Sequence, residues 1–302
     1  MAEFEMNEYG NVNVSRCSFI SNSAIYYKPA GGTDGRGGAV RNARGTSKFV
    51  DCWFEENTCA AYGGAIHIDY GANSSYDNCV FFHNGGSMHG GAINIAGTAT
   101  FVSIMNSVFV NNYTSFGNGY ACGRAIALDG SVVTVQNTIF RGNVSTHGPD
   151  IGDYWTRWNC QPNQSDRVLY SNLEYPLGSP VDPNWPPTPV DPSNLLNVDP
   201  LFVDAANPKG PDGIPMTADD GMALKPLSPC INSGTDTGAS LTDILGNARP
   251  YPGWPVDMGA YESQSEPCVP TGEDICNGLD DDCDGLVDGG DPDGDGVTEA
   301  CE

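Results

Sequence analysis

Carboxylates at alternate positions near the end of the chain have the spacing of calcium-binding loops. One set is Asp280, Asp282, Asp284, Asp288 and Asp291, and the next is Asp291, Asp293, Asp295, Glu299 and Glu302. In an EF-hand loop, oxygen ligands alternate in the same way, and glycine stands at the sharp turn, where Gly285 and Gly296 lie here. A ligand set this rich in hard oxygen favours Ca²⁺ over Cu²⁺ or Zn²⁺. The spacing predicts bound Ca²⁺, although both loops need Asp291 and no convincing helix flanks either loop.

The composition of the same segment allows a second interpretation. Residues 264–302 hold 13 acidic residues and no Lys or Arg, which is also typical of a disordered acidic tail. A disulfide between Cys276 and Cys283 would brace a segment too small to have a core. Residues 275–285, which read Ile-Cys-Asn-Gly-Leu-Asp-Asp-Asp-Cys-Asp-Gly, resemble the metal-binding motif of bacterial surface proteins related to a secreted copper-binding protein.

Four polar residues in the first half of the chain are candidates for catalysis: Arg41, His67, Asp69 and Asp129. If the repeats described below stack in register, Asp69 and Asp129 are two coils apart, about 10 Å at ~4.8 Å per coil. This is near the separation of the two carboxyl groups in inverting glycosidases, and His67 or Arg41 could act as a base. The alternative, which we favour, is that these are solvated polar residues of the surface.

Two phrases recur along the first half and determine how those residues are positioned. In the first phrase, Phe stands three residues before Asn, and the pairs are Phe19–Asn22, Phe54–Asn57, Phe81–Asn84, Phe109–Asn112 and Phe140–Asn143. The second phrase is Gly-Gly-Ala followed by Val or Ile, at 37–40, 63–66 and 90–93, with a degraded copy at 123–126. The phenylalanines are 35, 27, 28 and 31 positions apart, and such a period is typical of a solenoid.

Alternating apolar and polar residues between the turns predict short β-strands, as in 65–69, 92–96, 98–102 and 131–135. Coils with two or three such strands form a parallel β-helix, in which equivalent residues stack. We therefore expect an internal Phe column, an Asn column at a turn that tolerates left-handed backbone, and glycines with positive φ. Cys17, Cys52 and Cys79 share one register. One of them could bridge to the next coil, but free buried thiols are the slightly favoured reading.

The paired Gly-Gly-Ala-Ile and Phe-x-x-Asn phrases resemble the repeats of polymorphic outer-membrane proteins and of right-handed β-helix proteins in the pectate-lyase-like superfamily. The resemblance covers residues 15 to about 155. It implies the fold but no single activity, because this fold carries lyases, hydrolases, adhesins and phage spikes.

From residue 156 the pattern changes to a Pro-rich stretch at 181–192 and then to four phrases in a fixed order. These phrases are Asp-Pro-Leu-Phe at 199–202, Ser-Pro-Cys-Ile-Asn-Ser-Gly at 228–234, Asp-Ile-Leu-Gly-Asn-Ala-Arg-Pro at 243–250 and Asp-Met-Gly-Ala-Tyr-Glu at 257–262. They resemble the C-terminal module of secreted bacterial proteins described as choice-of-anchor type Q, which implies a cap over the last open edge of the solenoid. An acidic turn at 211–220 could hold calcium, but a solvated loop is the favoured reading.

The composition of the 302-residue chain limits its compartment and partners. The net charge of −25 argues against nucleic acid, because phosphate contacts need clustered Lys and Arg. Eleven cysteines indicate an oxidising compartment, and no apolar run is long enough to span a membrane. The first residues lack a signal peptide, so we expect a fragment or a mature chain of an extracellular or surface protein.

Together these features predict an all-β protein: a right-handed parallel β-helix at 1–155, a Pro-rich excursion with final coils and a cap at 156–263, and a calcium-binding tail at 264–302. We expect a monomer, secreted and attached to the cell surface, that serves in adhesion or binds a polysaccharide or cell-surface glycan. The alternatives are a polysaccharide lyase or glycoside hydrolase, and a structural spacer. An acidic polymer would be repelled by this charge unless Ca²⁺ bridged it, which disfavours the lyase.

Overall fold

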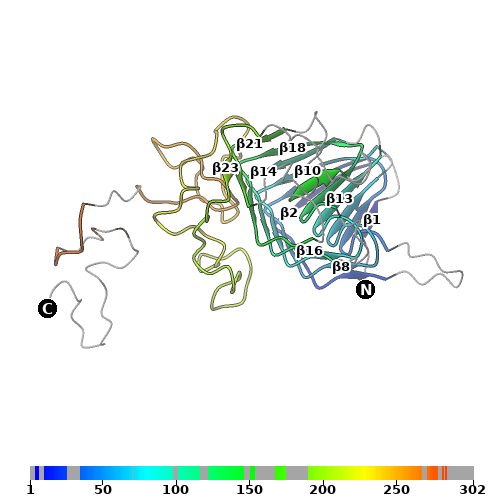
Figure 1. The fold of residues 1–302 in the computed structure, drawn as a ribbon, viewed down its shortest axis with the longest axis horizontal. Helices are drawn as coiled ribbons and strands as arrows, with labels where there is room; N and C mark the ends of the chain where they lie inside the picture. Colours follow the sequence, from blue (N-terminus) through cyan, green and yellow to red (C-terminus); the bar gives the residue numbers. More distant parts are fainter. Residues whose placement is uncertain are drawn as a thin grey trace, which may run out of the picture.

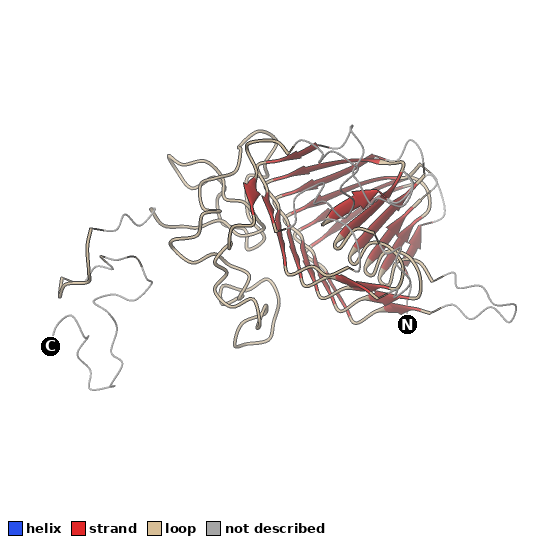
Figure 2. Cartoon of the chain, viewed as in Figure 1, coloured by secondary structure: helices blue, strands red, loops and turns tan. Residues whose placement is uncertain are grey.

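The computed structural model describes residues 4–6, 10–25, 35–69, 71–97, 101–115, 122–145, 150–153, 167–174, 190–266, 271–277, 281 and 283. These residues form strands, turns and loops, with no helix among them (Figure 2). The strands build four parallel sheets, which the chain visits in turn before it returns to the first (Figure 1). The prediction of an all-β protein with stacked parallel coils is confirmed. The shape is solenoid-like, and we call the four sheets together the solenoid body. Within the described segments, no helix could cross a membrane.

We label the sheets A to D in the order in which the chain meets them within a coil. Sheet A contains β1 (Phe4–Met6), β5 (Val40–Asn42), β9 (Ile66–Ile68), β13 (Ile93–Ala96), β17 (Ile126–Asp129) and β20 (Ile151–Asp153). Sheet B contains β2 (Asn11–Ser15), β6 (Thr46–Val50), β10 (Asn73–Asp77), β14 (Phe101–Met105), β18 (Val132–Gln136) and β21 (Arg167–Leu169). Sheet C contains β3 (Ser18–Ile20), β7 (Trp53–Glu55), β11 (Val80–Phe82), β15 (Val108–Val110), β19 (Ile139–Arg141), β22 (Asn172–Leu173) and β23 (Leu195–Leu196). Sheet D contains β4 (Ser23–Ala24), β8 (Thr58–Cys59), β12 (Gly85–Gly86) and β16 (Tyr113–Thr114).

A complete coil therefore has four strands, where the sequence predicted two or three. The additional strand is in sheet D, whose members are only two residues long. Segments this short carry no alternation of apolar and polar residues, so periodicity alone does not reveal them.

An aromatic column fills the interior, as predicted. The rings of Phe19, Phe54, Phe81, Phe109 and Phe140 stack nearly parallel, with successive centroids 4.8, 4.7, 4.5 and 5.0 Å apart. The strands pair in register, so equivalent side chains repeat at the spacing between strands. Ring stacking adds to the burial of apolar area, and the column fixes the registration of one coil on the next.

Beside this column, the five asparagines form a ladder of amide hydrogen bonds. The Nδ2 of each of the first four donates to Oδ1 of the asparagine in the next coil at 2.9 to 3.0 Å. From Asn57 onward, each Nδ2 also donates to a backbone carbonyl in the preceding coil. The ladder is confirmed, but the expected left-handed backbone falls one residue earlier. Ser21, Glu56 and His83 have φ of 54°, 54° and 52°. The asparagines therefore satisfy buried backbone groups, while the residue before each of them makes the turn.

The Gly-Gly phrase turns the chain into sheet A. The first glycine has positive φ in every copy: 64° at Gly37, 69° at Gly63, 67° at Gly90 and 68° at Gly123, as predicted. The second position must be glycine for lack of space, because a Cβ on Gly64 would lie 2.0 Å from the carbonyl oxygen of Gly91 in the next coil.

Residues 198–266 belong to the segment for which the sequence predicted final coils and a cap. They lie against the outer face of sheet C, and we call them the flank module (Figure 1). Outward side chains from four successive strands form its seat: Trp53, Val80, Val108 and Ile139. Phe202, Met222, Ile244, Met258 and Tyr261 of the module pack on them. Burial of this apolar column under the module holds the module against sheet C.

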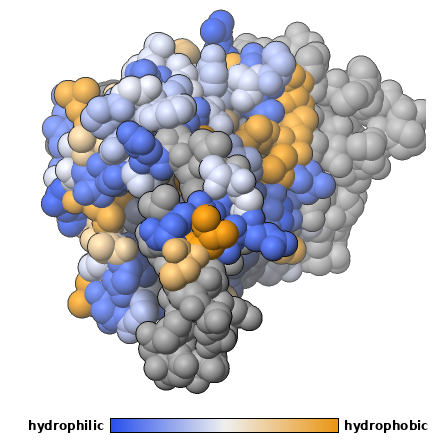
Figure 3. Space-filling view, turned by 90° about the vertical axis from the view of Figure 1, so that its left-hand side faces the viewer, coloured by the Kyte–Doolittle hydropathy of each residue, from blue (hydrophilic) through white to orange (hydrophobic). Residues whose placement is uncertain are grey.

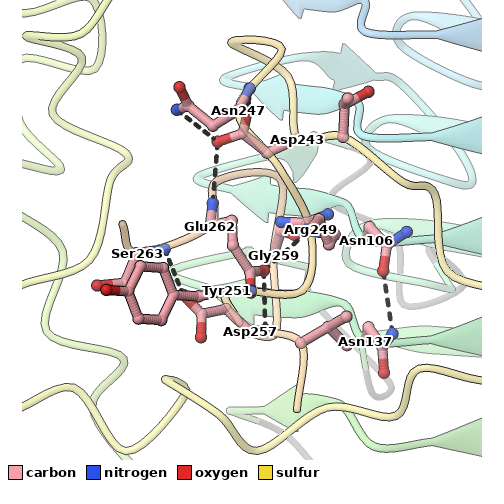
Figure 4. A network of polar contacts seen from close by, with 12 residues as sticks. Asn106, Asn137, Asp243, Asn247, Arg249, Tyr251, Asp257, Gly259, Glu262 and Ser263 are labelled. Atoms are coloured by element: carbon pink, nitrogen blue, oxygen red, sulfur yellow. Dashed lines mark hydrogen bonds and ion pairs between the residues drawn. The ribbon is translucent and has the colours of Figure 1, made fainter. Parts of the chain in front are cut away.

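A buried polar junction joins the module to the solenoid body (Figure 4). Arg249 donates through Nε to Glu262 Oε2 at 2.9 Å, through one terminal nitrogen to Asn78 Oδ1 at 2.9 Å, and through the other to the Gly259 carbonyl at 3.0 Å. The side chains of Arg249 and Glu262 are fully buried. The opposite face of the module, which is mostly hydrophilic with scattered apolar groups, looks away from the solenoid body (Figure 3).

Candidate functional site

The outward face of sheet A holds the candidate residues in the predicted columns. Arg41 pairs with His67, His67 with Asn94, and Asn94 with Ala127. In the next column, Ala96 pairs with Asp129, and Asp69 follows β9 at the equivalent position. These positions are not a solvated surface, however: His67 is 1% exposed, Asp69 4% and Asn94 0%. Burial of so many polar groups on an outward face requires a specific explanation.

The Asp69 carboxylate is the centre of the cluster. Its Oδ2 accepts hydrogen bonds from Arg36 at 3.1 Å, from Arg41 at 3.3 Å and from His67 Nε2 at 3.2 Å. Arg36 comes from the turn before the Gly-Gly phrase, Arg41 from β5, and His67 from β9 one coil further on. Two guanidinium groups and an imidazole thus share one carboxylate oxygen, which fixes their directions.

The protonation states follow from burial and charge. Burial lowers the pKa of His67, and the neighbouring Asp69 only partly opposes this, so the imidazole is neutral at neutral pH. Burial alone would raise the pKa of Asp69, but the hydrogen bond from His67 and the charge of Arg41 outweigh it, and the pKa is lowered. An ionised carboxylate only accepts hydrogen bonds, so Nε2 of His67 carries the proton and Nδ1 presents a lone pair.

A second column borders the first one and was missed in the sequence. Arg36, Tyr62 and His89 stand directly before the Gly-Gly phrase in three successive coils, and their backbones pair. The Arg36 guanidinium lies 5.8 Å from the centroid of the Tyr62 ring, and that ring stacks on His89 at 5.7 Å. Burial lowers the pKa of His89 to about 4. The signal that could have revealed this column is its fixed position before each glycine pair.

Several buried polar atoms of the cluster have no hydrogen-bond partner among the described residues. They are Nδ1 of His67, Oδ1 of Asp69, and both Oδ1 and Nδ2 of Asn94. An unsatisfied buried polar group costs about 1–3 kcal/mol. Four such atoms on neighbouring positions mark a place where a bound molecule or ordered water would restore the lost hydrogen bonds.

The exposure of these side chains determines which chemistry is available. The side chains of Arg36 and Arg41 are 29% and 24% exposed, so they can touch a ligand from solvent, together with half-buried Tyr62. Asp69 has a lowered pKa and therefore cannot supply a proton at neutral pH, as the acid of a glycosidase pair must. Asp129 lies two coils from Asp69 by register, and no described contact brings the two together. The arrangement fits binding better than hydrolysis.

The predicted metal ligands of the tail are Asp280, Asp282, Asp284, Asp288, Asp291, Asp293, Asp295, Glu299 and Glu302, and all of them lie outside the described residues. Within the described parts of the chain, no cluster of His, Cys, Asp and Glu has the arrangement of a metal site. In the acidic turn at 211–220, Asp219 accepts from Asp212 N at 3.2 Å, and Asp220 accepts from Met216 N at 2.8 Å and Thr217 N at 3.1 Å. These carboxylates therefore brace their own loop.

No protein-family model, no curated protein and no solved structure matches the chain.

Proposed function

We propose that the chain is a secreted, surface-attached β-helix protein that binds glycans through Arg41 on the outward face of sheet A and through Arg36 and Tyr62 in the turns that lead into this sheet. We call these three residues the arginine rim. The observation that carries the proposal is the convergence of both arginines on Asp69, above buried polar atoms of His67 and Asn94 that lack partners. Hydroxyl-rich ligands need fixed donors and acceptors, and the rim supplies donors that are already held in place.

The aromatic component of the rim favours a sugar over other polar ligands. Tyr62 offers an apolar ring face next to the guanidinium of Arg36, and a sugar ring presents apolar C–H surface on one side and hydroxyls at its edge. An amphipathic ring with a hydroxyl tip suits such a ligand. Binding sites generally combine an apolar wall with a few precisely directed polar groups.

The stacked coils, the Phe and Asn columns and the order of the phrases in the flank module support the finer classification. We infer a right-handed parallel β-helix of the pectate-lyase-like kind, with polymorphic outer-membrane-type repeats and a choice-of-anchor Q-like module. Disulfides at Cys122, Cys276 and Cys283 support an extracellular or outer-surface location, because such bonds persist in oxidising compartments.

Calcium binding by the tail is part of the proposal. Asp281 lies between two predicted ligands and accepts hydrogen bonds from the Thr271 hydroxyl at 3.0 Å and from Asn277 Nδ2 at 2.8 Å. Asp281 thus makes hydrogen bonds within the segment, as expected for a carboxylate between two ligand positions of an alternating loop. The neighbouring carboxylates Asp280 and Asp282 are the ones proposed to bind the ion. When bound, Ca²⁺ would neutralise part of the acidic charge of the tail.

The test of glycan binding is a glycan array with the full chain, with and without Ca²⁺, followed by titration of any glycan that binds. Combined replacement Arg36→Ala and Arg41→Ala removes charge-assisted donors worth about 1.5–3 kcal/mol each, so binding should weaken at least about tenfold. Lys48→Ala is the matched control, because Lys48 is an exposed cation on sheet B. An array without any bound glycan, or full binding by the double variant, would refute the proposal.

An enzyme of the lyase type remains the second candidate, and one observation favours it: Nδ1 of His67 presents a lone pair next to an ionised aspartate. A base so placed could take a proton from a sugar ring. Because His67 is 1% exposed, a substrate reaches it only if the site opens. Release of unsaturated sugar from a bound glycan, lost in His67→Gln, would favour the enzyme over the binding protein or a structural spacer.

A further inference from the structure

Three cysteines stack on successive coils at the start of sheet C. Trp53 N donates to Cys17 O at 2.9 Å, and Val80 N donates to Cys52 O at 2.9 Å, so Cys17, Cys52 and Cys79 occupy equivalent positions. Neighbouring strands lie about 4.8 Å apart, within the Cα separation of about 4.4–6.8 Å that a disulfide spans. All three thiols are free.

In later coils, hydroxyl residues occupy the same position in this column. Ser107 Oγ accepts from Cys79 N at 3.1 Å, and Ser171 Oγ accepts from Thr138 N at 3.2 Å. The backbone therefore needs no sulfur at this position, and a Cys→Ser change places there a residue that the fold already uses. Cys→Ser variants of this column should therefore remove the thiol without disturbing the fold.

The three thiols differ in their access to solvent. Cys17 is partly exposed, whereas Cys52 and Cys79 are fully buried. The Cys52 Sγ lies 3.8 Å from the carbonyl oxygen of Val14, which belongs to the coil that carries Cys17. An oxidant can thus reach the first thiol, and the second thiol occupies the equivalent position in the next coil.

The acidity of the thiols differs as well. A hydrogen bond from the Cys79 thiol lowers the pKa of Cys52, although burial opposes the shift. Burial raises the pKa of Cys59 to about 11 and that of Cys230 to about 11. A thiolate is the nucleophile in disulfide exchange, so Cys52 is the buried thiol best prepared to react.

We propose that Cys17 and Cys52 are a thiol-modification site, in which a small-molecule disulfide such as oxidised glutathione is converted to a bond between the first two coils. The Cys17 thiolate attacks one glutathione sulfur, forms a mixed disulfide and releases one glutathione thiolate. The Cys52 thiolate then attacks Cys17 Sγ, forms the Cys17–Cys52 bond and releases the second glutathione thiolate. The protein loses two electrons and two protons, and one oxidised glutathione becomes two reduced molecules.

The test is incubation of the full chain with oxidised glutathione, followed by alkylation of free thiols and peptide mapping without reduction. The expected product is a cross-linked pair of peptides that contains Cys17 and Cys52, with loss of alkylation at both positions and no retained glutathione. In Cys52→Ser the reaction should stop at glutathione on Cys17, and in Cys17→Ser the column should stay unmodified.

Cys59→Ser is the matched control, because Cys59 is a buried free thiol outside the column, and it should leave the cross-link unchanged. Circular dichroism before oxidation checks that each variant keeps its strands. Persistent glutathione on Cys17 of the unmodified chain, a bond between Cys52 and Cys79 instead, or no reaction at Cys17 would each overturn the proposal.

Discussion

Replacement Arg249→Met should loosen the flank module from the solenoid body. The side chain is fully buried and donates to Glu262, Asn78 and the Gly259 carbonyl. Methionine fills similar space without a charge, so Glu262 becomes a buried anion that retains only the backbone donors of Tyr251 and Asp257. Removal of one partner from a buried ion pair costs about 3–5 kcal/mol, and we expect a loss of this size in the free energy of unfolding.

Guanidinium denaturation followed by circular dichroism measures that loss, and limited proteolysis shows whether residues 198–266 are cleaved first. Arg16→Met is the matched control: Arg16 pairs with Asp51 at 3.7 Å, but its side chain is 64% exposed, so the cost should be about 1 kcal/mol or less. If Glu262 is also replaced by Leu, part of the loss should be recovered, because no buried charge remains. If Arg249→Met alone is no less stable than the Arg16→Met control, the Arg249–Glu262 pair does not hold the module.

Three further predictions concern the ladder, the module and the tail. Asn84→Ala leaves the backbone N–H of Asn57 without its acceptor and removes the bonds from the Asn84 amide to the Phe54 carbonyl and to Asn112 Oδ1, so it should cost about 3 kcal/mol or more in chemical denaturation, while Ser75→Ala at a partly exposed position on sheet B should cost little. Burial and the charge of Glu262 raise the pKa of Asp257 from 3.8 to about 7; the folded state therefore holds a proton that the unfolded state has lost, and stability should fall as pH rises between those values. Denaturation of Asp257→Asn should show a weaker fall over this range, and an unchanged pH profile would contradict the assignment. Calorimetry of the full chain with Ca²⁺ should show binding that weakens when Asp291, shared by both loops, becomes Asn; absence of heat in the parent chain would remove the calcium prediction.

The parts of the fold that could be predicted are those that repeat. Phe81 and Asn84 recur at fixed spacing because stacked coils require the same side chain at the same corner, and that requirement is visible in one sequence. The flank module was predicted as a segment, but its contact with the outer face of sheet C was not predicted. The sequence predicted that Phe81 lies inside, but only the structure shows that its apolar neighbour Val80 faces outward and supports the module.

The candidate site was predicted in part for a related reason. The columns that contain His67 and Asp69 were predicted correctly, because the register of the coils follows from the sequence repeat. The position of Arg36 before the first glycine pair was a signal in the sequence, but its contact with Asp69 spans 33 residues and became visible only in the structure. Nor does a sequence of alternating residues indicate that an outward-facing histidine will be buried, because burial depends on what the connecting loops cover.

The contact between the flank module and sheet C affects how the coils of the solenoid body separate during unfolding. A solenoid normally frays from its ends one coil at a time, since each repeat contacts only its neighbours. Here one segment contacts Trp53, Val80, Val108 and Ile139, which belong to four consecutive coils. The flank module therefore couples these four coils, and separating one of them from its neighbour also disturbs the contacts of the module. In the coil before Trp53, the equivalent outward residue is Ser18, which is exposed, so the apolar contact with the module does not extend to it.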